Sequence, residues 1–275
     1  MNIRKVLIVS LVLLLLAGCS SPQDSDSEGN NVLRVGMECN YAPFNWTTTT
    51  PSDTTVPITS VDYADGFDVV IASMLAEKTG MQVQIVKLDW DNLIPALQHD
   101  QIDVVIAGMT DTPLRRESVD FTTPYYVSEE VIIIRKDSPL ASIDSIAALR
   151  GYKVQGQMNT IYDEIIDQID GVIHVPAAET FPASIQALAA GGVDAVTSEL
   201  PVAVGVVSAN PNLMYVQFAQ GKGFSGSEQD ASVSIAVKKG NTELLNALQA
   251  ALDTISEAQR QQLMLDATSR QPAGE

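Results

Sequence analysis

The stretch DVVIAGMTDTPLRRESVDFTTPYY, residues 103–126, decides the fold, because an apolar strand in it ends in small and hydroxylated residues. Residues 103–107 are predicted to form a buried strand, and Gly108 and Thr110 follow it directly. A strand end of this kind leaves backbone N–H groups free, and the nearby Arg115 can meet a carboxylate with two parallel hydrogen bonds. No catalytic nucleophile accompanies these residues. The stretch therefore predicts a grip for a small anion.

Outward from this stretch, apolar runs alternate with helical patterns along most of the chain. Such alternation is typical of an α/β fold with largely parallel sheets, whose ligands bind at the carboxyl ends of the strands. Residues 47–66, rich in Thr, Pro, Ser and Asp, are predicted to be a long surface loop. The predicted strands are 33–37, 83–88, 103–107, 131–135, 152–155, 172–175, 193–197, 214–218 and 232–237. The predicted helices are 68–78, 91–99, 142–149, 161–168, 183–190, 201–208, 241–252 and 256–267.

The N-terminal residues indicate export. Arg4 and Lys5 precede the apolar run 6–16, which is shorter than the ~20 residues of a membrane span and is typical of a signal-peptide core. Leu-Ala-Gly directly before Cys19 resembles a bacterial lipobox, which implies a signal peptide over 1–18 and a lipid on the Cys19 thiol. An ordinary signal peptide with a chance cysteine is the alternative. We expect an acidic tether over 19–30 and a lipid-anchored protein on the extracytoplasmic face of the cell membrane.

The charge balance limits the possible partners. The formal net charge is −18, and removal of Arg4 and Lys5 leaves 14 of the 16 basic residues against 34 acidic ones. An acidic chain of this kind argues against nucleic acid as a partner. It favours cationic ligands through long-range steering, although solubility is an equally good explanation. With Cys19 lipidated, Cys39 has no partner, so no intrachain disulfide is expected.

Motifs for catalysis and for metal or cofactor binding are not found. His99 and His174 lie in unrelated contexts and lack the spacing of metal ligands. The chain contains no Gly-x-Ser-x-Gly and no glycine-rich phosphate loop. We expect no cofactor, no metal site and no enzymatic activity.

Several motifs together resemble the extracellular solute-binding proteins of polar amino-acid ABC transporters. The resemblance covers about residues 31–267 and rests on LRVGMECNYAPFNW (33–46), GFDV (66–69), WDNLIPAL (90–97), the opening stretch and VDAV (193–196). It implies a two-lobed, type II periplasmic-binding-protein-like clamshell with two hinge strands. Lobe one is then 31–124 plus 233–275, lobe two 129–230, and the hinges lie near 125–128 and 231–232. The implied partners are a free amino acid, an ABC permease and its ATPase, and the protein is expected to be a monomer.

The resemblance also implies roles for lobe-one residues. Arg115 matches the arginine that clamps the ligand α-carboxylate, while Gly108, Met109 and Thr110 match the segment whose backbone and hydroxyl lie beside that carboxylate. A surface ion pair of Arg115 with a neighbouring acid, Glu117 or Asp120, is the alternative. Arg116 is expected to be a solvated neighbour.

Further residues are implied around the rest of the ligand. Glu199 matches an acid that pairs with the ligand α-ammonium, although an acid in the first turn of the next helix is equally ordinary. Tyr41 and Trp90 match two aromatic residues that enclose the ligand side chain, and Glu38 matches an acid at its distal end. A carboxylate between aromatic faces suits an ammonium or guanidinium, and also accepts an amide. Asn159 or Thr160 is expected to supply a polar contact from QGQMNT (155–160), which departs from the Gly-Thr-Thr common in the family.

The sequence therefore predicts a binding protein for a polar, cationic amino acid such as arginine, lysine or histidine. Glutamine or another neutral polar amino acid is the alternative within this class. A prephenate or arogenate dehydratase on the same architecture, and a sensory lipoprotein without a permease, are the alternatives of other classes.

Overall fold

The computed structural model describes residues 31–226 and 231–272. The predicted signal peptide, the acidic tether and Cys19 lie outside the described residues. Within the described ranges, no helix combines the length and the apolar character that crossing a membrane would require.

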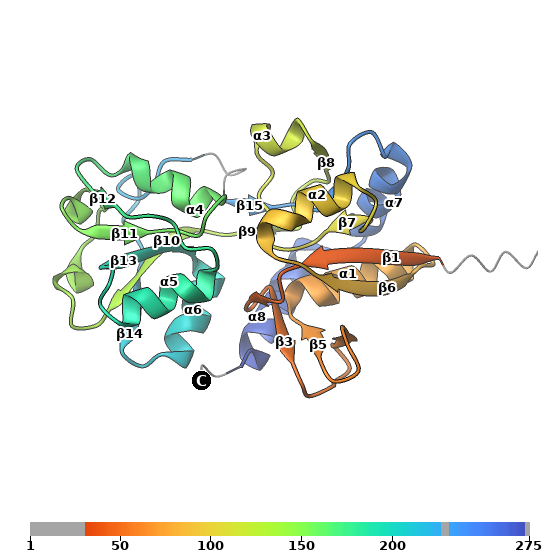
Figure 1. The fold of residues 1–275 in the computed structure, drawn as a ribbon, viewed down its shortest axis with the longest axis horizontal. Helices are drawn as coiled ribbons and strands as arrows, with labels where there is room; N and C mark the ends of the chain where they lie inside the picture. Colours follow the sequence, from red (N-terminus) through yellow and green to blue (C-terminus); the bar gives the residue numbers. More distant parts are fainter. Residues whose placement is uncertain (1–30, 227–230, 273–275) are drawn as a thin grey trace, which may run out of the picture.

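The chain folds into two α/β lobes, each built on a five-stranded sheet (Figure 1). In both sheets parallel and antiparallel pairs are mixed. The first sheet has the order β6-β1-β7-β16-β8, with bounds Gln82–Lys87, Val32–Met37, Val104–Val105, Ala236–Lys238 and Val119–Phe121. The second has the order β12-β11-β13-β10-β14, with bounds Ile173–His174, Lys153–Gln155, Ala195–Glu199, Glu130–Arg135 and Leu213–Val216. The predicted two-lobed α/β fold is confirmed.

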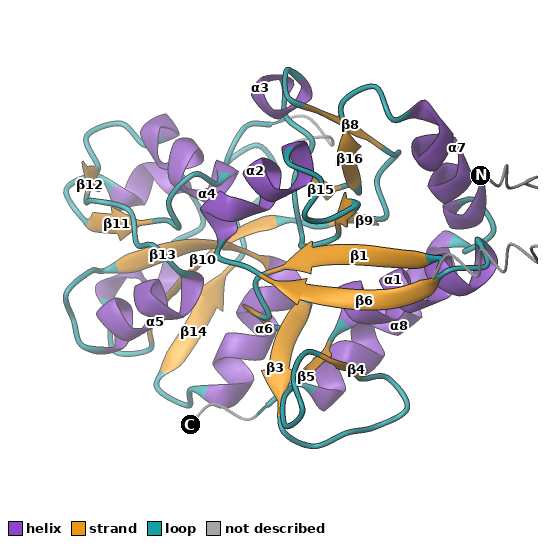
Figure 2. Ribbon diagram, turned by 45° about the vertical axis from the view of Figure 1, so that its right-hand side comes forward, coloured by secondary structure: helices purple, strands orange, loops and turns teal. Residues whose placement is uncertain are grey.

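The helices cover the faces of these sheets. In the first lobe α2 lies on one side of β1 and α1 on the other (Figures 1 and 2). The first-lobe helices are α1 (Phe67–Lys78), α2 (Leu93–Gln98), α3 (Pro113–Arg116), α7 (Thr242–Leu252) and α8 (Glu257–Arg270), with the 3-10 turn η1 (Trp90–Asn92). The second-lobe helices are α4 (Ile161–Glu164), α5 (Phe181–Ala189) and α6 (Leu200–Ala209), with the 3-10 turns η2 (Pro139–Ser142), η3 (Ile146–Leu149) and η4 (Ile165–Gln168). Most apolar side chains on their inner faces are buried, as expected for helices that pack on a sheet.

The chain passes between the lobes along a two-stranded ribbon. Strand β9 (Tyr126–Val127) pairs antiparallel with β15 (Ser232–Val233). Because one crossing leads into the second lobe and the other leads out of it, the first lobe is discontinuous in sequence. The predicted single strand 232–237 is wrong, since β15 and β16 are separate. Between them Ser234 N donates to Met109 O and Ile235 N donates to Thr122 Oγ1.

The predicted long loop over residues 47–66 is wrong. Strands β2 (Asn40–Tyr41), β3 (Asn45–Thr48), β5 (Tyr63–Asp65) and β4 (Val56–Pro57) form a four-stranded antiparallel sheet in that order. Buried side chains from all four strands anchor it to the first lobe. The turn-forming residues occupy only the connections, so composition alone concealed the strands.

The predicted helix over residues 142–149 is also wrong. The two 3-10 turns η2 and η3 replace it. The Ser145 side chain accepts a hydrogen bond from Ala147 N and so begins a new turn inside the predicted helix. A serine that bonds its own backbone competes with helix continuation.

Candidate functional site

A cavity between the two lobes lies where the first sheet ends after β7. Residues of the first lobe form one wall and residues that follow β11 form the other. The cavity is lined by Glu38, Tyr41, Trp90, Ala107, Gly108, Thr110 and Arg115 from the first lobe, and by Gln157, Thr160, Ile161 and Tyr162 from the second. The lining brings two charged side chains, Glu38 and Arg115, together with the hydroxyls of Tyr41, Thr110, Thr160 and Tyr162.

Arg115 contributes a guanidinium that has no carboxylate partner within salt-bridge distance among the described residues. It donates to two main-chain carbonyls, Thr110 O at 2.7 Å and Asn159 O at 3.0 Å. Its Cζ lies 5.2 Å from the centroid of the Trp90 ring, a cation–π distance. Burial lowers the pKa of Arg115 to about 10. A partly buried cation whose hydrogen bonds all go to neutral carbonyls is prepared to accept an anion.

Local structure explains why Arg115 and Arg116 differ. Thr112 caps the short helix α3 by accepting from Arg115 N at 3.2 Å, which turns Arg115 toward the cavity. Arg116 points away and pairs with the buried Asp111, so it is not simply solvated. Asp120 pairs instead with Lys239 at 2.7 Å. The alternative ion pair of Arg115 with Asp120 or Glu117 does not form.

Glu38 lines the same wall and is 6% exposed. The amide Nε2 of Gln157, from the second lobe, lies 3.3 and 3.4 Å from its two carboxylate oxygens. Burial raises the pKa of Glu38 to about 7, and the hydrogen bonds from Gln157 and Asn40 oppose this rise. The carboxylate is therefore only partly compensated, and a cation beside it would be bound strongly.

Glu199 is 1% exposed and lies behind Tyr41 instead of on the cavity wall. Its Oε1 accepts from the Tyr41 hydroxyl at 2.8 Å, while Oε2 has no well-aligned partner although the hydroxyls of Tyr162 and Ser128 are close. Burial raises the pKa of Glu199 to about 7. The residue precedes helix α6, yet its side chain makes no capping hydrogen bond. A role as a helix cap therefore does not explain it.

Tyr41, Trp90 and Gly108 shape the space between these charges. The Tyr41 ring stacks on Phe44 at 5.6 Å and meets Phe181 edge-on at 5.4 Å. Gly108 has φ +61°, and a Cβ there would lie 3.4 Å from the Tyr41 ring. Its N–H donates to the Tyr125 hydroxyl at 3.0 Å, so the prediction of free N–H groups at this strand end is wrong for Gly108.

Two other predicted residues lie beside the cavity. Asn159, with φ +59°, joins the lobes because its carbonyl accepts from Trp90 Nε1 at 3.1 Å and from Arg115, and its amide donates to Asp91 at 2.7 Å. Met109 is buried and faces a neighbouring groove that Asn159 also lines. Sequence reasoning missed four lining residues, although the strand-end rule applied after β11 points to two of them. These four are Ala107, Gln157, Ile161 and Tyr162.

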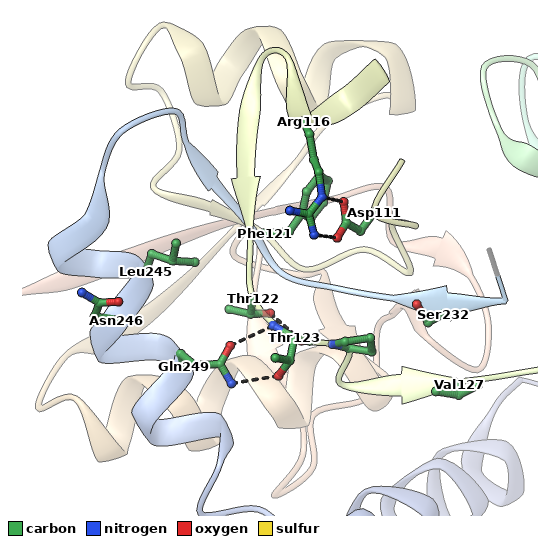
Figure 3. A pocket seen from close by; sticks show the side chains of 11 residues that line it. Asp111, Arg116, Phe121, Thr122, Thr123, Val127, Ser232, Leu245, Asn246 and Gln249 are labelled. Carbon is green, nitrogen blue, oxygen red and sulfur yellow. Dashed lines mark hydrogen bonds and ion pairs between the residues drawn. The ribbon is translucent and has the colours of Figure 1, made fainter. Parts of the chain in front are cut away.

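A second cavity, of about 570 Å³, lies at the hinge between β8, β15 and helix α7 (Figure 3). Its charged groups and the amide of Gln249 already have partners: Arg116 pairs with Asp111, and Gln249 bonds both N and Oγ1 of Thr123. The interlobe cavity contains incompletely compensated charges and is the better candidate. Within the described ranges no cluster of three or more His, Cys, Asp or Glu side chains could hold a metal ion.

Comparison with known proteins bears on the family and the fold. Residues 33–266 match the bacterial extracellular solute-binding proteins, family 3. The chain is 32% identical over 159 residues to the arginine-binding extracellular protein ArtP of Bacillus subtilis, covering 58% of this chain and 56% of that protein. A solved ancestral arginine-binding protein bound to arginine is 33% identical, with a TM-score of 0.71 over 86% of this chain and 97% of that one. An ancestral arginine-binding protein was also solved with glutamine, at 32% identity, a TM-score of 0.71 and the same coverage.

Proposed function

The chain belongs to the bacterial extracellular solute-binding proteins, family 3, and from this membership we propose that it binds a cationic L-amino acid between its lobes. It delivers that amino acid to an ABC permease driven by an ATPase. The relatives that it resembles are binding proteins, and it acts as one without catalysing a reaction.

The guanidinium of Arg115, which has no salt-bridge partner among the described residues, carries the proposal together with the buried carboxylates of Glu38 and Glu199. Arg115 takes the ligand α-carboxylate, and Thr110 adds its hydroxyl beside the same group. Glu199 lies behind Tyr41 and acts on the α-ammonium through the Tyr41 hydroxyl, and Glu38 takes the cationic end of the side chain. A ligand with one anionic and two cationic groups matches the charges of Arg115, Glu199 and Glu38. Burial from both lobes strengthens each contact.

The direct test is calorimetric titration of the purified protein with the twenty standard amino acids and ornithine. We expect the largest affinity for arginine, lysine, histidine or ornithine. Absence of heat with every one of them contradicts the proposed class of ligand. Incubation with prephenate and arogenate tests the dehydratase alternative, for which product formation would be required.

Glutamine is the second candidate ligand. The Gln157 amide already lies against Glu38, so an amide donor fits this end of the cavity. The solved ancestral protein with glutamine supports the same alternative. A higher affinity for glutamine than for arginine would decide in its favour.

Lipid attachment at Cys19 is the proposed anchor. It rests on the Leu-Ala-Gly-Cys sequence after the apolar run. In cells, Cys19→Ser should move the protein from the membrane fraction to the soluble extracytoplasmic fraction. An unchanged distribution would contradict the lipoprotein assignment.

A further inference from the structure

A third buried carboxylate, Asp68, lies behind the cavity and does not line it. It is in the first turn of α1 and is 0% exposed. No cation of the described residues lies within salt-bridge distance of it. Burial raises the pKa of Asp68 to about 6, while hydrogen bonds from Tyr125, Asn45 and the Gly108 backbone favour the charged form. A buried acid held only by neutral donors requires an explanation.

Each oxygen of Asp68 leads to a different part of the cavity wall. Oδ1 accepts from the Tyr125 hydroxyl at 2.7 Å, and the same hydroxyl accepts from Gly108 N at 3.0 Å. Oδ2 accepts from Asn45 Nδ2 at 2.8 Å, and Asn45 Oδ1 accepts from Cys39 N at 2.8 Å. The carboxylate is therefore the centre of one continuous network that ends at two backbone N–H groups.

Both of these N–H groups belong to left-handed turns that carry ligand-facing residues. Gly108 has φ +61° and begins the segment with Thr110. Cys39 has φ +55° and directly follows Glu38. Left-handed geometry is costly for a residue with a Cβ, so the turn at Cys39 needs an external constraint. The network supplies that constraint at Cys39 and fixes Gly108 in the same way.

We propose that Asp68 is a positioning residue for ligand binding, which through Tyr125 and Asn45 holds the turns at Gly108 and Cys39 in register with each other. The inference rests on the proposed function, because Gly108 lies at the carboxylate end of the ligand and Glu38 at its side-chain end. One carboxylate thus sets the spacing between the two ends of the site.

The test compares three variants with a matched control. Tyr125 and Asn45 both donate a hydrogen bond to Asp68 in the wild type. In Asp68→Asn the new NH2 group faces one of these two donors, whichever way the amide turns, so one of the two hydrogen bonds is lost. The double exchange Asn45→Asp with Asp68→Asn restores an acceptor for every donor, including Cys39 N. Tyr125→Phe removes the hydroxyl that links Asp68 to Gly108 N and leaves the Asn45 branch in place. Asp65→Asn is the control, because Asp65 is also buried in the first lobe but pairs with Arg270 outside the network.

Two quantities are measured for each protein: affinity for L-arginine by calorimetry, and urea unfolding without ligand. We expect Asp68→Asn and Tyr125→Phe to weaken binding by about tenfold or more. Part of the binding free energy would then be used to restore the displaced turns. The double exchange should return the affinity to within about threefold of wild type. Asp65→Asn should leave the affinity unchanged even where it lowers stability.

The outcomes separate this role from a purely structural one. Wild-type affinity in Asp68→Asn and Tyr125→Phe, with only unfolding affected, overturns the proposal. So does a double exchange that folds but binds no better than Asp68→Asn. If Asp68→Asn does not fold, the other two variants still decide. Wild-type affinity in Tyr125→Phe overturns the proposal, and so does a double exchange that folds but does not bind within about threefold of wild type. If the wild type binds neither L-arginine nor any other amino acid, the proposed function itself fails, and this role fails with it.

Discussion

Replacement of Arg115 by methionine should abolish most ligand binding and cost the unliganded protein little. The guanidinium has five N–H donors, of which Thr110 O and Asn159 O occupy two. Three donors remain, enough for two parallel bonds to a carboxylate. Loss of one partner of a buried, hydrogen-bonded charge pair costs about 2–5 kcal/mol, so the affinity should fall by about 30- to 4,000-fold.

Arg115→Met should raise the stability of the unliganded protein or leave it unchanged. Burial lowers the pKa of Arg115 from 12.5 to about 10, and one pKa unit corresponds to about 1.4 kcal/mol. Burial therefore opposes the charge by at most about 3 kcal/mol, since no carboxylate of the described residues lies within salt-bridge distance of it. Arg115→Met removes this unfavourable charge together with two neutral hydrogen bonds, so no large loss of stability is expected.

Arg116→Met is the matched control, because this neighbour pairs with Asp111, which is 4% exposed. Removing a partner of a buried acceptor costs about 1–3 kcal/mol, so this variant should lose stability but keep its affinity. Calorimetry with L-arginine and urea unfolding without ligand measure both quantities. The reasoning is refuted if Arg115→Met binds within threefold of wild type, or if it loses more stability than Arg116→Met.

Three further predictions concern the carboxylates. Glu38→Gln should reduce the preference for arginine over glutamine by at least about tenfold, because the charge that faces the side-chain cation is lost; competition binding measures the ratio, and an unchanged ratio contradicts the assigned role. Tyr41→Phe removes the hydroxyl that lies 2.8 Å from Glu199 and should weaken binding about tenfold, whereas equal affinity in calorimetry would mean that Glu199 acts without it. The pKa values of Glu38 and Glu199 are raised to about 7, and a bound cation lowers them. Binding should therefore release protons below about pH 7, and affinity should rise from pH 5 to 8; calorimetry in two buffers with different ionisation heats detects the protons, and equal heats would contradict the prediction.

The sequence predicted the parts of the site that depend on one strand end. Gly108, Thr110 and Arg115 follow an apolar strand, and short-range geometry places them on one wall. Gln157 and Tyr162 follow another strand and form the opposite wall, so their place in the site depends on how the second lobe meets the first. Such contacts span more than a hundred residues in sequence, as the distance from Glu38 to Gln157 illustrates.

Other differences arise where local composition conflicts with tertiary pairing. The segment between Trp46 and Asp65 contains many turn residues, yet these two residues are cross-strand partners and both are buried. The position of Glu199 behind Tyr41 could not be predicted either, because it depends on how the second lobe meets an aromatic ring of the first. Secondary structure in the second lobe also departs from prediction where Ser145 begins a new turn.

The contacts between the lobes suggest how closure depends on the ligand. Several of them need no ligand: Tyr41 bonds Glu199, and Asn159 bonds Asp91, Trp90 and Arg115. These contacts favour closure, while the burial of one unpaired guanidinium and two incompletely compensated carboxylates opposes it. A ligand that supplies opposite charges at all three positions removes the opposing contribution and keeps the favourable contacts. A ligand that lacks the second cation leaves Glu38 uncompensated. The population of the closed state should therefore depend on how many of the three charges the ligand compensates, and not only on the size of the ligand.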